Sequence, residues 1–139
     1  MATVRKEILT RATPEAVWAA VRDVGALHTR LVPGFVTDTR VEGSTRIVSF
    51  ANGAVLRELI VSLDDGARRL VWTAEGGRTS HYNAAVQVFP ETAGGTRVVW
   101  TADFLPDEVT AAIDAAMTAG GAAMQRAMDG LVTTPRIRG

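Results

Sequence analysis

Two side chains in this sequence have the types and positions suited to chemistry: a glutamate and a tyrosine in two separate apolar stretches. Glu58 lies in the stretch Ala54–Leu63, and Tyr82 stands near the start of His81–Val88. A carboxyl group in an apolar site has its pKa raised by desolvation, so it can orient a ligand hydroxyl or act as a general acid or base. A buried tyrosine hydroxyl needs a hydrogen-bond partner, which a ligand could supply. Glu58 and Tyr82 are therefore the candidate catalytic residues. The alternatives are a solvated strand position for Glu58 and a plain core aromatic for Tyr82.

Other catalytic and metal-binding chemistries lack the residues or the spacing that they need. The two histidines, His28 and His81, have no His-x-x-x-His or similar spacing, so we predict no metal site. Ser49, Thr37 and Thr101 have no base partner at the level of sequence, so a Ser-His-Asp triad is not predicted. Cysteine is absent, which excludes disulfides, thiolate metal sites and a cysteine nucleophile. We expect no cofactor.

Length and composition predict one globular domain. The 139 residues are 47% hydrophobic, enough for a single core, and we expect one domain over residues 1–132 and a short polar tail over 133–139. Fifteen basic and fifteen acidic residues give a net charge of zero, so nucleic acid is not an expected partner. The start of the sequence has no apolar signal core, and no stretch approaches the ~18 apolar residues of a membrane span. We therefore expect no membrane span and a cytoplasmic protein.

Turn residues divide the sequence into a strand, two short helices, six further strands and a long helix. The first strand is expected at Val4–Leu9. Thr13-Pro14-Glu15 then opens a helix, with Thr as the N-cap and Pro in the first turn, and a second short helix is expected at Ala26–Leu31. The six further strands are expected at Phe35–Glu42, Thr45–Phe50, Ala54–Leu63, Arg69–Glu75, His81–Val88 and Thr96–Leu105. Their connectors, such as Asn52-Gly53, are tight turns, so the strands should form an antiparallel meander.

The long helix, expected over Asp107–Val132, carries an apolar stripe and two adjacent glycines. The stripe has the spacing that a helix presents to a sheet, and its residues are Val109, Ile113, Met117, Met124, Met128 and Leu131. Gly120 and Gly121 each cost about 1 kcal/mol relative to alanine, so space or a close backbone approach is a reason to keep them. Flexible methionines above and below the glycines favour a cavity between the helix and the sheet. A plain core stripe is the alternative.

Several short stretches occur in an order that is typical of one superfamily. They are Ala12-Thr13-Pro14-Glu15-Ala16-Val17-Trp18, Arg57-Glu58-Leu59 leading to Asp64-Asp65, Arg68-Arg69, Tyr82, Gly95-Thr96-Arg97-Val98-Val99-Trp100 and Phe104-Leu105-Pro106. With the order of elements, they make residues 3–132 resemble the START/Bet v 1-like (SRPBCC) superfamily, including its bacterial polyketide cyclase/dehydratase-like branch. The resemblance implies an α+β helix-grip fold, a seven-stranded curved antiparallel sheet with two short helices and one long C-terminal helix over an apolar cavity. Members of the superfamily bind sterols, lipids, hormones or polyketides.

Strand alternation and the resemblance together indicate which side chains line that cavity. Alternation places Trp72 and Tyr82 on the inward faces of their strands. The strand of Glu58 is apolar on both faces, so there the resemblance decides, and it places Glu58 in the pocket. The expected ligand-binding residues are Leu31, Phe35, Ile47, Ser49, Leu56, Glu58, Ile60, Trp72, Ala74, Tyr82, Ala84, Val86, Val99, Thr101, Ile113, Met117, Gly120, Gly121 and Met124.

The two arguments disagree on the strand Thr96–Leu105. Alternation favours Trp100 and its even-numbered neighbours facing inward, because the residues between them include charged and polar side chains. The resemblance favours Val99, Thr101 and Asp103 instead. Similar proteins often have a glutamate that points into the cavity immediately before this tryptophan, and this chain has Val99 there. An acid is thus missing at that position.

Three functions follow from these observations. The first is the binding of a small hydrophobic molecule, lipid-like, aromatic or polyketide-like, in the internal cavity. The second is a polyketide cyclase/dehydratase-like enzyme that uses Glu58 and Tyr82, and Val99 disfavours it. The third is a ligand-gated interaction module like the plant hormone receptors, which ranks last because the turn at Asn52-Gly53 and the loop at residues 76–80 are short. The protein is expected to be a monomer or a homodimer.

Overall fold

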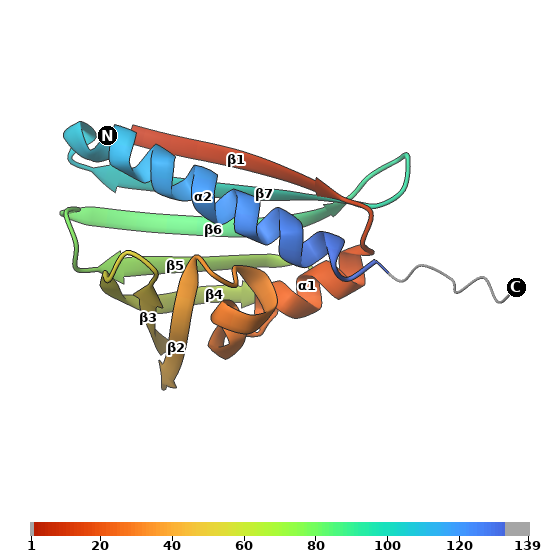
Figure 1. The fold of residues 1–139 in the computed structure, drawn as a ribbon, viewed down its shortest axis with the longest axis horizontal. Helices are drawn as coiled ribbons and strands as arrows, with labels where there is room; N and C mark the ends of the chain where they lie inside the picture. Colours follow the sequence, from red (N-terminus) through yellow and green to blue (C-terminus); the bar gives the residue numbers. More distant parts are fainter. Residues whose placement is uncertain (1, 133–139) are drawn as a thin grey trace, which may run out of the picture.

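A seven-stranded antiparallel sheet forms the centre of the computed structural model, which describes residues 2–132 (Figure 1). The strands are β1 (Ala2–Thr10), β2 (Val36–Glu42), β3 (Thr45–Phe50), β4 (Val55–Asp64), β5 (Arg69–Glu75), β6 (His81–Pro90) and β7 (Thr96–Leu105). Their order is β1-β7-β6-β5-β4-β3-β2, so consecutive strands from β2 to β7 are neighbours and β1 pairs with β7. The predicted antiparallel meander is confirmed, with strand ends within two residues of those expected.

The sheet is strongly bent at its β2–β4 side. Pairing registers shift between Val36 and Asp38 in β2 and between Ile60 and Ser62 in β4. Such bulges bend a strand and increase its twist, and Figure 1 shows β2 lying steeply across the direction of β6 and β7. The turn between β3 and β4 is closed by Gly53, which donates its N–H to the Phe50 carbonyl and has a φ of +92°, a backbone conformation that favours glycine. The bend makes one face of the sheet concave.

The short helices connect β1 to β2 at one end of the concave face. Helix α1 (Pro14–Arg22) begins where predicted, because the Thr13 hydroxyl accepts a hydrogen bond from the Ala16 N–H at 3.2 Å. The second helical segment is a 3₁₀ turn, η1 (Val24–Ala26), followed by a π-helical turn, η2 (Leu27–Leu31), rather than one α-helix. Leu27 and Leu31 are both buried, so η2 closes part of the core.

The long helix crosses the concave face of the sheet from the end of β7 (Figure 1). Its regular part is α2 (Thr110–Asp129), preceded by the 3₁₀ turn η3 (Asp107–Val109). The predicted span Asp107–Val132 is therefore three residues too long at each end of the α-helix. Its buried residues are Met117, Gly120, Gly121, Ala123, Met124 and Met128, whereas Leu131 is 39% exposed and does not belong to the buried stripe.

Alternating residues of β5, β6 and β7 supply the inward face of the core. Leu70, Ala84, Val98 and Phe104 are at most 1% exposed, and one cluster of buried residues joins the sheet to α1, η2 and α2. None of the helices within residues 2–132 is both long and apolar enough to cross a membrane. The polar tail predicted at 133–139 lies outside the described residues, and the cytoplasmic location stays a prediction.

Candidate functional site

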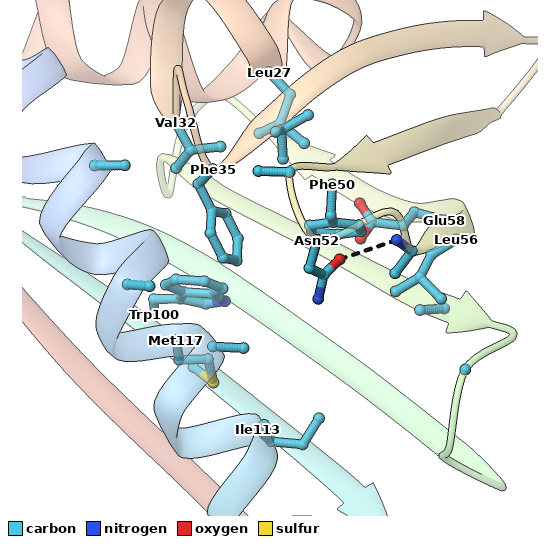
Figure 2. A pocket seen from close by; sticks show the side chains of 18 of the residues that line it. Leu27, Val32, Phe35, Phe50, Asn52, Leu56, Glu58, Trp100, Ile113 and Met117 are labelled. Carbon is cyan, nitrogen blue, oxygen red and sulfur yellow. Dashed lines mark hydrogen bonds between the residues drawn. The ribbon is translucent and has the colours of Figure 1, made fainter.

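A cavity of about 770 Å³ lies between the concave face of the sheet, α2 and the segment from η2 to β2. Figure 2 shows its walls: Met117 comes from α2, Trp100 and Phe35 lie next to each other beside that helix, and Leu56 and Glu58 come from β4. Volumes of this order are typical of small-molecule sites. The space that the sequence predicts between helix and sheet is therefore present.

The cavity opens between α2 and two connections of the sheet. The β3–β4 turn contributes Ala51 and Asn52, and the β5–β6 loop contributes residues 76–79. Across the opening, α2 presents small exposed residues, among them Ala112 and Ala116. Small side chains obstruct this opening less than large ones would, and residues of both short connections line the same cavity.

One buried ion pair provides most of the polarity of the inner wall. The Arg46 Nε donates to Glu58 Oε1 at 2.8 Å, and the two side chains are 2% and 7% exposed. The residues lie directly opposite each other on β3 and β4. The Arg46 guanidinium carbon also lies 5.1 Å from the centre of the Trp72 ring, a cation–π distance. Arg46 is thus held from two sides.

The pKa of Glu58 is raised above its ordinary value because burial penalises the carboxylate, although the charge and hydrogen bond of Arg46 offset part of this effect. Trp72 lowers the pKa of Glu58 slightly, yet its indole N–H meets no acceptor at hydrogen-bond geometry among the described residues. The indole of Trp72 therefore acts on the Glu58 carboxyl as a nearby dipole and not as a hydrogen-bond donor. Glu58 remains a carboxyl group that can hold or release a proton inside the cavity.

Tyr82 also lines the cavity, stacked against Phe104 with ring centres 6.5 Å apart. Burial, and then the charge of Glu58, raises the pKa of the Tyr82 hydroxyl, so it is a proton donor at neutral pH. No hydrogen bond of this hydroxyl occurs among residues 2–132. A ligand oxygen in the cavity could accept one from it.

The structure places eleven of the nineteen expected ligand-binding residues on the cavity wall. They are Leu31, Phe35, Leu56, Glu58, Trp72, Ala74, Tyr82, Val86, Ile113, Met117 and Met124. They come from η2, the η2–β2 segment, β4, β5, β6 and α2, which only the tertiary fold brings together.

Two expected wall residues on β3, Ile47 and Ser49, are wrong. The inward positions of β3 are Arg46 and Val48, which are 2% and 0% exposed, so their neighbours point to the outer face. The prediction failed because an arginine is seldom buried. Glu58 opposite Arg46 makes that burial possible.

Val99 and Thr101 are also wrong as wall residues. Val98 and Ala102 are fully buried and Trp100 lines the cavity, so β7 follows the alternation and the resemblance misplaced it by one residue. Val99 and Thr101 border a shallow depression on the outer face instead. The absence of an acid at Val99 therefore takes nothing away from this cavity.

Neither of the two adjacent glycines of α2 lines the cavity, and only Gly120 serves close packing. A Cβ on Gly120 would lie 3.0 Å from ring atoms of Phe35 and of Trp100, so the helix backbone rests directly against those rings. Gly121 faces β1, where a Cβ would meet only Ile8, at 4.0 Å. Of the two reasons given for the glycines, close approach is correct for Gly120.

Ala84 and Ile60 face inward but lie off the cavity wall. Ala84 is 1% exposed within the core, and Ile60 packs against the core from β4. Their inward direction was predicted correctly, and the extent of the cavity was not. The alternation of a strand predicts on which face of the sheet a residue lies. It does not predict which part of that face is covered by other side chains.

The expected ligand-binding residues leave out several that line the cavity, chiefly Arg46, Asn52, Arg78, Trp100 and Arg126. Alternation alone identifies Trp100. The pairing of Arg46 with Glu58 could have been inferred from the register of a tight β3–β4 hairpin. No signal in the sequence places Arg78 or Arg126 at the cavity. Arg78 lies in a loop, which has no periodic pattern, and Arg126 lies outside the apolar stripe of its helix.

Neither of the two histidines lines the cavity. The His28 Nδ1 lies 3.0 Å from the Thr39 hydroxyl, which joins η2 to β2, and His81 is exposed on β6. Within residues 2–132, no group of three or more histidine or acidic side chains is placed to hold a metal ion.

Comparison with known proteins gives the family. The profile of the polyketide cyclase/dehydrase and lipid transport family matches residues 1–134. The chain therefore belongs to this family, within the START/Bet v 1-like superfamily. No curated protein matches the sequence.

Solved structures support the same fold. A protein from Thermobifida fusca is 27% identical with a TM-score of 0.76, and the match covers 99% of this chain and 100% of that one. A START superfamily protein from Mycobacterium smegmatis is 10% identical with a TM-score of 0.72, over 92% and 94% of the two chains. Truncated norcoclaurine synthase from Thalictrum flavum is 18% identical with a TM-score of 0.73, over 97% and 95%. The helix-grip fold predicted from the sequence is confirmed.

Proposed function

We propose that this protein binds a small hydrophobic molecule in the cavity between its sheet and α2. The observation that carries the proposal is the cavity of about 770 Å³ with a mainly apolar wall, built by residues such as Leu56, Trp72, Trp100 and Met117. Membership of a family described by polyketide cyclisation and lipid transport supports a ligand of this class. Burying ~300 Å² of apolar ligand surface at ~25 cal/mol per Å² contributes about 7 kcal/mol before the cost of association, so micromolar affinity is the upper limit for a ligand without polar anchors.

The experiment fills the cavity mouth from an exposed position. Ala116 lines the mouth and is exposed, so Ala116→Trp should leave the protein folded while occupying the entrance. Ala122 is exposed on α2 away from the cavity, which makes Ala122→Trp the matched control. We expect the neutral dye N-phenylnaphthylamine to bind the wild type and Ala122→Trp equally and Ala116→Trp at least tenfold more weakly. Absence of dye binding to the wild type, or equal binding to both variants, would refute the proposal.

Proton-transfer catalysis is the second candidate, favoured by a buried carboxyl of raised pKa and a tyrosine whose hydroxyl feels the charge of that carboxyl, both on the wall of the same cavity. In this mechanism Glu58 removes a proton next to a ketone of the ligand, and Tyr82 donates a hydrogen bond to the developing oxyanion. The test is exchange of the α-protons of a bound apolar diketone with D₂O, followed by NMR. Tyr82→Phe should reduce the exchange rate by about 10²-fold without weakening dye binding. No exchange above the rate in buffer would exclude this candidate and leave the binding function standing.

A further inference from the structure

Positively charged side chains outnumber negatively charged ones on the cavity wall. The wall contains three arginines, Arg46, Arg78 and Arg126, and one acid, Glu58, which gives it a net charge of +2 (3 − 1). The whole chain has a net charge of zero, so this excess is local. Arg46 and Glu58 neutralise each other at 2.8 Å. The remaining positive charge belongs to Arg78 and Arg126.

Arg78 lies at the mouth of the cavity with no ion pair to any residue in the described part of the chain. Other hydrogen-bond donors line the same rim. Asn52 uses its side-chain oxygen to accept from the Ala54 N–H at 3.0 Å, which leaves its amide N–H groups available, as Figure 2 shows. Thr79 follows Arg78 in the same loop and also lines the cavity, and its hydroxyl is a further hydrogen-bond donor. This rim therefore has a cation and two further donors, and no acidic side chain lines it.

Arg126 stands at the other end of the cavity. The β5–β6 loop is tied to the end of β7 by a hydrogen bond from Ser80 N to Leu105 O, just before η3 begins. From Val109 to Arg126 the chain rises about 25 Å along the helix at 1.5 Å per residue, so one small anionic group cannot meet both arginines. Near Arg126 the wall is formed by apolar residues such as Ala123.

We propose that the ligand of this cavity is an amphipathic acid, with its apolar body between the sheet and α2 and its carboxylate against Arg78, Asn52 and Thr79 at the mouth. The inference rests on the proposed function and names its ligand class. Arginine and carboxylate form charge-assisted hydrogen bonds that are shorter and stronger than neutral ones. A neutral analogue of the same size fills the apolar part equally but leaves the Arg78 charge without a partner.

The test compares each acid with its alcohol by displacement of bound N-phenylnaphthylamine, using laurate against dodecanol and naphthaleneacetate against naphthaleneethanol. We expect the acid of each pair to bind the wild type about fivefold more tightly, the upper range for a solvent-exposed ion pair. The preference should fall toward unity in 1 M salt, where the screening length is about 3 Å. Arg78→Gln should abolish the preference and leave the alcohols unaffected.

Two variants serve as controls. Arg57→Gln removes a cation that is 55% exposed on the neighbouring strand β4 and does not line the cavity, so it should retain the preference, and so should Arg126→Gln. Equal affinity for acid and alcohol in the wild type, or a preference that survives Arg78→Gln or is lost in Arg126→Gln, would overturn the inference while dye binding still supports the proposed function. Failure of the dye to bind the wild type would instead remove both.

Discussion

Arg46 and Glu58 face each other across β3 and β4 inside the cavity, with Arg46 Nε 2.8 Å from Glu58 Oε1. Both side chains are almost completely buried. Removing two charges from water is costly, and their mutual attraction offsets the cost only while both are present. The pair therefore determines how the protein tolerates change at either residue.

Glu58→Leu should destabilise the protein by about 3–5 kcal/mol, because it leaves the Arg46 charge buried without its hydrogen-bond acceptor. The double change Arg46→Met/Glu58→Met should restore the free energy of unfolding to the wild-type value or above, since the thioethers fill the space without charge. Urea denaturation of the three proteins measures both effects. A Glu58→Leu protein as stable as the wild type would show that the pair is not a buried electrostatic unit.

The raised pKa of Glu58 predicts a particular dependence of stability on pH. Between the ordinary carboxyl value of 4.5 and the raised pKa of the folded state, the native protein holds a proton that the unfolded chain has lost. The free energy of unfolding contributed by Glu58 therefore falls as pH rises through this window, and is constant above it.

Urea denaturation at a series of pH values, for the wild type and Arg46→Met/Glu58→Met, isolates this contribution. Glu7 and Asp65, whose pKa values are lowered by their arginine partners, occur in both proteins and cancel in the difference. The stability of the wild type relative to the double variant should decrease with rising pH. An increase would mean that Arg46 outweighs burial and that the pKa of Glu58 is lowered.

Alanine at the two neighbouring glycines of α2 should have opposite effects. Gly120→Ala places a methyl group 3.0 Å from Phe35 and Trp100, and such overpacking costs about 1–3 kcal/mol, more than the ~1 kcal/mol gained in helix propensity. Gly121→Ala meets only Ile8, at 4.0 Å, so it should stabilise the protein by up to about 1 kcal/mol. Thermal or urea unfolding measures the pair, and equal effects at both positions would contradict the packing described for Gly120.

An acid at position 99 should not affect the cavity. Val99 lies on the outer face opposite Glu7 and near Arg5 and Arg97. The like charge of Glu7 and the two arginines act in opposite directions, so Val99→Glu should change stability by less than about 1 kcal/mol and leave dye affinity unchanged. The comparison is Leu56→Glu, which puts a carboxylate on the cavity wall and should weaken binding of a neutral dye by at least tenfold. If Val99→Glu weakens binding as strongly, β7 faces the other way.

Local patterns in the sequence determined most of the secondary structure and the directions of many strand residues. Thr13 and Pro14 begin α1 as predicted, because capping depends on residues three positions apart. Alternation placed Trp72, Tyr82 and Trp100 on the inward face correctly, since strand geometry repeats every two residues. The enclosed cavity also followed from the resemblance of the whole chain to its superfamily.

The tertiary structure alone decided where charge and space lie within that frame. Arg46 is inward because Glu58 stands opposite it on another strand, a pairing that overrides the usual exposure of arginine. Gly120 packs against Trp100, twenty residues earlier in the chain, and so does not add to the cavity. Arg78 lines the cavity because the β5–β6 loop and α2 border the same space. Each of these features depends on contacts between segments that are far apart in the sequence. A local pattern of residues does not predict which distant segments come into contact.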